Sequence, residues 1–196
     1  MLRLAFSADK SMAKQTSASV DETELLSRIV EGDGAAFEAF YNAYYPRLYR
    51  FILRVTHKPD TVEELIQDTL MVVWEKPESF DHSCKLSTWV FGIAYRKALK
   101  SLAKNSRYSS MVDLEGMEEI LADSRPTPAV DLEVANWLET ALATLPADQR
   151  AVLELTFHHG LHYRDVALIL DCPENTVKTR MFHARKKLQA FASDLK

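Results

Sequence analysis

The sequence is poor in the residues that build metal sites, disulfide frameworks and phosphate loops. Its two cysteines, Cys84 and Cys172, form no CxxC pair, which argues against a zinc ribbon or a disulfide framework. Its five glycines provide no Gly-rich phosphate loop, and neither GxSxG nor HExxH occurs. These absences predict a protein of a reducing cytoplasm that is not an enzyme, with no catalytic residue and no cofactor.

Long apolar runs are absent as well. The N-terminal MLRLAF is too short for a secretory signal, and no later segment reaches about eighteen uninterrupted apolar residues. We therefore expect a soluble chain without direct membrane insertion. His158, His159 and His162 offer imidazoles, but Gly160 is expected to break their helix, so no metal site is predicted.

A basic excess is also missing, since the 196 residues have a formal net charge of −4. Bulk charge thus gives no nucleic-acid signature, and any such function must come from the distribution of charge. The chain is 47% hydrophobic, enough to bury a sizeable core in one domain or two small ones.

The apolar residues that are present repeat with helical spacing, and strand-like alternation is missing. Two stripes at i, i+3, i+4, i+7 comprise Leu48, Phe51, Ile52, Val55 and Val62, Ile66, Leu70, Val73. A capping box of Thr61 and Glu64 predicts a helix from about Thr61 to near Pro77. Ser87 or Thr88 is expected to start another, from Trp89 to about Lys104. The fold class predicted is all-α, with about four helices in each half.

Composition divides the chain into four parts. Residues 1–20 are polar and are predicted to be a disordered leader, and residues 21–105 form a first helical domain. Residues 106–131 are acidic and contain serine and proline, which predicts a flexible linker. Periodicity resumes in residues 132–196, a second small helical domain. We expect two helical domains on a tether.

Two runs contain no acid although the chain is acidic overall: His82 to Val112, and Asn175 to Ser193. Solvated helix faces usually mix charge signs, so one acid-free run per domain favours two contacts to a single polyanion. An ordinary solvated face is the alternative. In the first run Trp89, Phe91 and Tyr95 accompany the cations, as stacking platforms for unpaired bases or as core residues.

The second run belongs to a predicted helix-turn-helix. One helix covers Tyr163 to Leu170, Asp171 supplies a left-handed turn residue, and a second helix begins at Glu174. With Val177 facing inward, the outer side of the second helix would enter a DNA major groove. A plain helical hairpin is the alternative. Glu174 either suits the helix dipole or accepts from cytosine.

Four ordered segments together resemble the extracytoplasmic-function (ECF, group IV) sigma factors of RNA polymerase, in the sigma-70 family. They are GDGAAFEAFYNAYYPRLYRFILR, VEELIQDTLMVVWEKPESFD, LSTWVFGIAYRKAL and LPADQRAVLELTFHHGLHYRDVALILDCPENTVKTRMFHARKKL. The resemblance implies a sigma-2 domain at 21–105 and a sigma-4 domain at 132–196. It implies promoter-specific transcription initiation in a stress or envelope-response regulon. The partners it implies are core RNA polymerase (β′ clamp coiled coil and β flap), promoter DNA (duplex and single-stranded nontemplate) and an anti-sigma factor.

The resemblance also assigns residues to roles. Polymerase binding falls to Glu63, Glu64, Leu65, Gln67, Asp68 and Trp74. Recognition and melting of the minus-ten element fall to Ser83, Lys85, Trp89, Tyr95, Arg96, Lys97 and Lys100. Recognition of the minus-thirty-five element falls to Arg164, Thr176, Lys178, Thr179, Phe182, His183 and Arg185. Many relatives have Asn where this chain has Arg96, so the minus-ten preference does not carry over.

Two other functions remain open at this point. One is a stand-alone helix-turn-helix regulator whose first domain senses a ligand or phosphate. The other is a helical metalloenzyme or a pure interaction scaffold. Copurification with core polymerase and elemental analysis separate these alternatives from a sigma factor.

Overall fold

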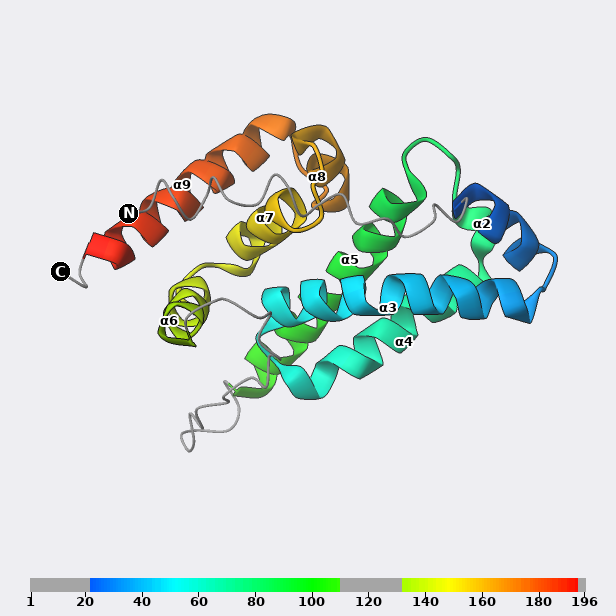
Figure 1. Ribbon diagram of the computed structural model, residues 1–196, viewed down its shortest axis with the longest axis horizontal. Coiled ribbons are helices and arrows are strands. Elements are labelled where there is room, and N and C mark those ends of the chain that lie inside the picture. The colour runs from blue at the N-terminus through cyan, green and yellow to red at the C-terminus, as the bar shows by residue number, and fades with distance from the viewer. Residues whose placement is uncertain (1–21, 110–131, 194–196) are drawn as a thin grey trace.

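The computed structural model describes residues 22–109 and 132–193, and their side chains over 22–104 and 137–193. The predicted leader and residues 110–131 of the predicted linker lie outside this range. The described parts contain eight α-helices, one short 3-10 helix and no strand, which confirms the all-α class (Figure 1). The first half has α2 (Glu22–Val30), α3 (Gly34–Thr56), α4 (Pro59–Glu75), η1 (Pro77–Ser79) and α5 (Leu86–Ser109). The second has α6 (Leu132–Ala143), α7 (Ala147–Phe157), α8 (Tyr163–Ile169) and α9 (Glu174–Ser193).

Helix α3 is the central element of the first half, and α2, α4 and α5 all pack against it. Its inner face buries Phe40, Tyr44, Leu48, Phe51, Ile52 and Val55. Asp33 caps its N-terminus, where Oδ1 accepts from the backbone N–H groups of Ala35 and Ala36. Both apolar stripes predicted from the sequence are buried.

The start of α4 differs from the prediction. The helix begins at Pro59, and the preceding Lys58 makes no side-chain capping bond. Proline suits the first helical position because its missing N–H would have no intrahelical partner there. Thr61 lies inside the first turn and its hydroxyl donates to the carbonyl of Lys58 at 3.0 Å. The predicted capping box at Thr61 is therefore wrong.

Helix α5 is longer than predicted at both ends. It begins at Leu86, before the predicted caps Ser87 and Thr88, which are buried in its first turn. It continues to Ser109, four residues into the segment predicted as linker. Serine and arginine near its end lowered the apolar periodicity without stopping the helix.

The helix-turn-helix is formed by α8 and α9. Asp171 has φ 49°, the left-handed conformation predicted for it, and Gly160 has φ 62° just after α7. The backbone N–H of Cys172 donates to the carbonyl of Ala167 at 3.1 Å, which closes the turn. Val166 and Val177 are fully buried between the two helices.

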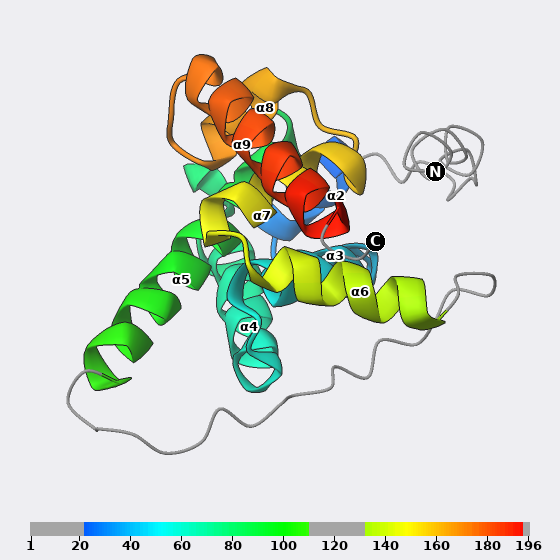
Figure 2. The same cartoon turned by 90° about the vertical axis from the view of Figure 1, so that its left-hand side faces the viewer.

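The two halves pack against each other through a continuous hydrophobic core. Helix α3 contacts α7, and α5 contacts α8 (Figures 1 and 2). Sequence patterns predicted two domains on a tether but not this contact, which we call the seam. It places the predicted minus-ten helix directly against the helix-turn-helix.

Candidate nucleic-acid interface

The outer face of α9 presents a polar and aromatic surface to solvent. Val177, Met181 and Ala184 point inward and are at most 2% exposed, which fixes the rotation of the helix. The four predicted major-groove residues are consequently exposed on its other side: Lys178, Thr179, Phe182 and His183. Phe182 is 62% exposed, a large apolar side chain with no place in the core.

Residues of this surface and its flank have local partners. Lys178 Nζ lies 2.9 Å from Glu174 Oε1, so the carboxylate of Glu174 forms an i,i+4 ion pair. Phe182 and His183 pack edge to face with centroids 5.5 Å apart. The guanidinium of Arg185 lies 5.5 Å from the ring of Phe157. All of these contacts are at the surface and leave the cations accessible.

The other two predicted minus-thirty-five residues lie on different helices. Arg164, on α8, has a side chain that is 72% exposed. Thr176 is half-buried in the first turn of α9, and its backbone N–H donates to the carbonyl of Pro173. The structure therefore places Thr176 on α9 itself and Arg164 at the exposed start of α8.

The predicted minus-ten residues are divided between a loop and α5. Ser83 and Lys85 are exposed in the loop, where the Ser83 hydroxyl donates to Asp81 Oδ1 at 2.7 Å. That hydrogen bond holds the pKa of Asp81 below its usual range. Trp89 is half-buried with its ring 5.4 Å from that of Phe80. Arg96 and Lys100 are exposed on the helix.

Tyr95 differs from the other predicted minus-ten residues. It is 4% exposed, and burial raises the pKa of its hydroxyl. Arg180, Asp148 and Cys172 of the second half are close enough to act on it electrostatically. In this arrangement Tyr95 is a core residue of the seam and no DNA base can reach it.

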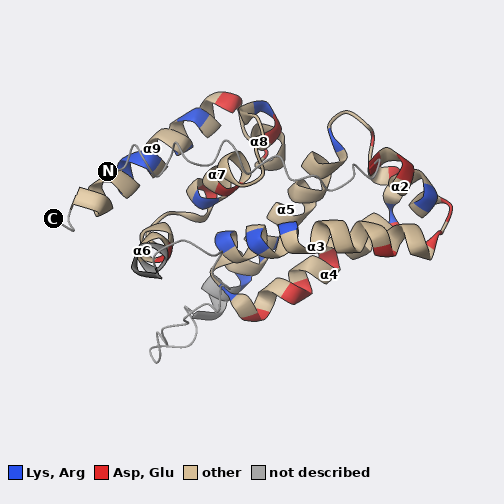
Figure 3. Cartoon of the chain, in the orientation of Figure 1, with Lys and Arg blue, Asp and Glu red and all other residues tan. Residues whose placement is uncertain are grey.

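Helix α4 presents the predicted polymerase-binding acids along its outer face (Figure 3). Glu63, Glu64, Gln67 and Asp68 are exposed. Glu63 accepts a hydrogen bond from the Tyr45 hydroxyl, which raises the pKa of Tyr45 to about 12. Asp68 Oδ2 lies 3.1 Å from Lys97 Nζ, so a predicted polymerase contact is paired with a predicted DNA contact.

The two apolar residues of that predicted surface are less accessible. Leu65 is 6% exposed and belongs to the core, because it shares the inner face of α4 with Val62 and Ile66. The sequence predicted that Leu65 contributes to an exposed polymerase-binding surface, and its burial corrects that prediction. Trp74 is half-buried against Phe37, with ring centroids 5.0 Å apart.

The sequence did not predict the polar cluster in the seam. Glu154 on α7 is 4% exposed, and its Oε1 lies 3.0 Å from Arg50 Nε on α3. Arg54 Nε lies 3.9 Å from its other oxygen. Burial nevertheless raises the pKa of Glu154 to about 7, because the loss of solvation outweighs the attraction of the two arginines.

Further contacts join the halves near Glu154. Arg150 Nη2 donates to the carbonyl of Val55 at 2.6 Å, and Arg54 bonds to Glu139 of α6. The ring of His159 packs 4.5 Å from Phe91. A sequence signal existed, since Glu154 is the one charged residue in the apolar run AVLELTF, but nothing in the sequence named its partners.

Membrane-spanning helices and metal-binding clusters are both absent from the part of the chain that the structure describes. Within 22–109 and 132–193, no helix is long and apolar enough to cross a membrane. In the same residues, no cluster of three or more His, Cys, Asp and Glu side chains is placed to hold a metal ion.

Each half of the chain matches a known protein family. The family model of sigma-70 region 2 matches residues 40–108, and that of sigma-70 region 4 matches residues 135–188. The chain is 30% identical over 162 residues to the ECF RNA polymerase sigma factor RpoE of Cereibacter sphaeroides, covering 82% of this chain and 88% of that protein. It is 27% identical over 153 residues to the ECF sigma factor SigM of Bacillus subtilis, covering 78% of this chain and 93% of the relative.

A solved structure gives the same result. The sigma factor RpoE of Bartonella quintana, crystallised with the anti-sigma factor NepR, superposes with a TM-score of 0.66 at 31% identity. The match covers 80% of this chain and 96% of that one. The fold and its exposed recognition helix define a two-domain helical protein of the sigma-70 class. Within that class, the chain belongs to the ECF RNA polymerase sigma factors.

Proposed function

We propose that this protein joins core RNA polymerase, reads two promoter elements and helps to open the duplex, without itself catalysing nucleotide transfer. A subunit with this role works in the cytoplasm, where the chromosome is. The observation that carries the proposal is the exposed surface of α9, where Lys178, Thr179, Phe182 and His183 stand clear of the core on a helix-turn-helix.

In this proposal α9 enters the major groove of the minus-thirty-five element. Lysine can donate to guanine and the Phe182 ring can contact a thymine methyl group, so both supply sequence discrimination. Arg164, Thr176 and Arg185 would contact phosphates, which position the helix without reading sequence. Glu174 already pairs with Lys178, so that ion pair must open or shift when Lys178 reaches a base.

Helix α4 would bind a basic coiled coil of the polymerase through Glu63, Glu64, Gln67 and Asp68. Complementary charge speeds such association and fixes its register. Trp74, half-buried at the C-terminal end of α4, would add apolar contact there. The Asp68–Lys97 ion pair suggests an exchange in which the polymerase takes Asp68 and frees Lys97 for DNA.

The loop containing Ser83 and Lys85, together with the exposed side of α5, would capture and stabilise unpaired bases of the minus-ten element. Trp89 offers a partly exposed aromatic ring for stacking. Arg96 and Lys100 supply cations for the strand, and Tyr95 would join them only after the seam opens.

Promoter binding requires the two halves to separate. Two elements roughly 25 base pairs apart lie roughly 85 Å apart along the duplex at 3.4 Å per base pair. Helices α5 and α8 are in contact in this structure and cannot reach both. An anti-sigma factor that stabilises such a closed arrangement would block promoter binding, and we propose one as a partner of this chain.

Retention of purified core polymerase on the immobilised full chain tests this function. The double variant Glu64→Ala, Asp68→Ala should weaken retention at least about tenfold, since each charged interfacial contact contributes to affinity. Glu38→Ala removes another exposed acid, on α3, and should leave retention unchanged. A stand-alone regulator would retain no polymerase in any form, which would overturn the proposal.

A further inference from the structure

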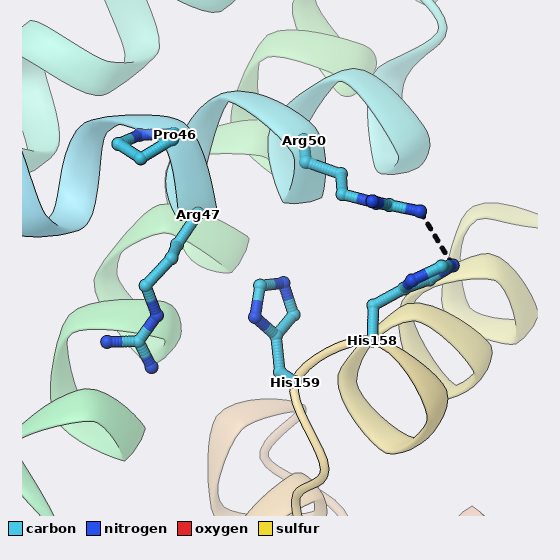
Figure 4. A pocket seen from close by; sticks show the side chains of 5 residues that line it. All are labelled: Pro46, Arg47, Arg50, His158 and His159. Carbon is cyan, nitrogen blue, oxygen red and sulfur yellow. Dashed lines mark hydrogen bonds between the residues drawn. The ribbon is translucent and has the colours of Figure 1, made fainter. Parts of the chain in front are cut away.

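A pocket of about 340 Å³ opens at the seam, between the middle of α3 and the end of α7. Its lining comes from both halves: Pro46, Arg47 and Arg50 on one side, and His158 and His159 on the other (Figure 4). Among the described residues the lining contains two guanidinium groups and two imidazoles but no carboxylate. A lining of this composition offers hydrogen-bond donors to an anion.

The two arginines are held in place but keep donors to spare. Arg47 lies over the rings of Tyr44, at 4.7 Å, and Phe91, at 5.4 Å, which orient it toward the pocket. Its nearest carboxylate is Glu22 at 3.5 Å, an exposed ion pair that an incoming anion can replace. Arg50 uses Nε toward Glu154 and Nη2 toward His158 Nε2, at 2.9 Å, out of the five N–H donors of a guanidinium.

His159 supplies the observation that points to a ligand. Its side chain is 7% exposed, yet Nε2 has no hydrogen-bond partner among the described residues. Glu154 Oε1 lies 3.8 Å from this nitrogen, beyond hydrogen-bond distance. In Figure 4 its ring lies between Arg47 and the Arg50–His158 pair. Buried polar nitrogens are normally satisfied, so this one is suited to a group that enters the pocket.

Other charges around the pocket limit what the ligand can be. Glu154 lies behind the lining on α7 and would repel an anion, but Arg50 and Arg54 of α3 both contact it. Arg47, also on α3, pairs instead with the more exposed Glu22. The ligand must therefore make strong, directed bonds to the guanidinium groups, which phosphate oxygens do in paired geometry.

We propose that the seam pocket binds a small phosphorylated molecule through its phosphate groups and that this ligand holds the two halves together. Its donors come from α3 of the first half and from the end of α7 in the second, so only the closed arrangement offers the complete site. A ligand that binds one of two states shifts the population toward that state. In a sigma factor that must open to bind a promoter, the ligand would act as an inhibitor, and this consequence alone rests on the proposed function.

Calorimetric titration of the full chain with sodium pyrophosphate, at constant ionic strength and pH 7, tests the site. We expect saturable binding at one site, weakened at least tenfold by Arg47→Gln, which removes the cation but keeps a polar side chain. Arg28→Gln is the matched control, because Arg28 is an exposed arginine that pairs with Asp33 outside the pocket. The absence of saturable binding, or equal affinity in Arg47→Gln, would overturn the proposal.

Parallel titrations identify the source of the phosphate. Orthophosphate, pyrophosphate and ADP present the same chemistry with different extensions. Tighter binding of ADP than of pyrophosphate would assign a nucleotide, and equal binding would show that the pocket reads phosphate alone. Weaker binding of ADP would assign inorganic pyrophosphate.

Hydrogen exchange with and without pyrophosphate tests the bridging. Slower exchange in peptides from both α3 and the end of α7 is expected, whereas protection confined to α3 would show that the ligand does not bridge the halves. Neither experiment contains polymerase or DNA, so their outcome is separate from that of the proposed function. Transcription is unsuitable as a readout here because pyrophosphate is also a product of RNA synthesis.

Discussion

Helices α5 and α9 contain most of the two acid-free runs of the sequence, and their surroundings in the structure differ. The predicted DNA-contacting residues on α9 are exposed, including the 62% exposed Phe182. Helix α5 has exposed cations, but Tyr95 is buried in the seam and Lys97 is paired with Asp68. The same charge pattern thus lies on an exposed surface in one half and on a partly covered surface in the other.

Under the proposed function, the closed arrangement would affect the two promoter contacts unequally. Helix α9 can meet duplex DNA with only the Glu174–Lys178 pair to rearrange. Helix α5 needs the seam to open before its full surface is available.

Acid should weaken the seam that covers α5. Burial lowers the pKa of His57 to about 4 and that of His159 to about 3, whereas burial raises that of Glu154 to about 7. Over most of the range from pH 6.5 to 4.5 the unfolded chain holds close to two protons on these groups, both on the histidines, while the folded chain holds one, on Glu154. The unfolded state therefore binds one more proton, so the free energy of unfolding should fall by about 2 kcal/mol on acidification through this window.

Urea unfolding at pH 7.5, 6.5, 5.5 and 4.5 measures this loss. Glu154→Gln removes the one group that opposes it, because a raised carboxyl pKa stabilises the folded state as pH falls. The variant should lose about twice as much stability between pH 6.5 and 4.5. An unfolding free energy that is constant across the window would show that these seam groups do not titrate as the structure indicates.

Trp89→Ala should impair melting of the minus-ten element more than binding to duplex DNA. Stacking of a base on an aromatic ring contributes about 1 to 3 kcal/mol, so open-complex formation should fall roughly five- to one-hundred-fold. Permanganate footprinting reports the melted bases, and a gel shift reports duplex binding. Trp89→Phe, which keeps a ring, is the control, and an equal loss in both assays would make Trp89 a core residue only.

Lys178→Ala should weaken recognition of the minus-thirty-five element by about 1 to 3 kcal/mol if the lysine contacts a base. The loss should be concentrated at one base pair when binding is measured over a set of single-base variants. Lys186→Ala, an exposed cation further along α9, should instead weaken all sequences by a similar factor. A uniform loss for Lys178→Ala would make it a phosphate contact.

Tyr95→Leu should have the smallest effect on melting. It keeps an apolar side chain in the seam but removes the ring, so open-complex formation should change by less than about 1 kcal/mol if Tyr95 is a packing residue. Permanganate footprinting beside Trp89→Ala provides the comparison. A loss as large as that of Trp89→Ala would mean that Tyr95 turns out to stack on a base once the halves part.

Local signals predicted most of the fold. Apolar periodicity located α3 and α4, and the sequence DCPEN predicted a turn whose Asp171 has the expected left-handed backbone. The exact starts of α4 and α5 were mispredicted. Helix α4 begins at Pro59 and α5 begins at Leu86, directly after Lys58 and Lys85, and neither lysine is a capping residue of the expected kind.

The residues of the candidate site were also predicted only in part. Lys178 was predicted to lie on the outer side of α9 and is exposed there, since a charged group favours water. Aromatic and apolar residues carry no such signal, so Tyr95 and Leu65 could not be separated from surface residues without the packing. The seam joins residues about 100 positions apart, such as Arg50 and Glu154, and no local pattern specifies such a pair.

Run-off transcription with purified core polymerase over a promoter library, varied at both elements, tests directly whether this chain gives the polymerase its promoter specificity. We expect transcripts that require this chain and depend on bases in both elements, with Lys178→Ala altering preference at the upstream element alone. Transcription that is independent of the chain, or chain-dependent transcription with no preference at either element, would contradict it.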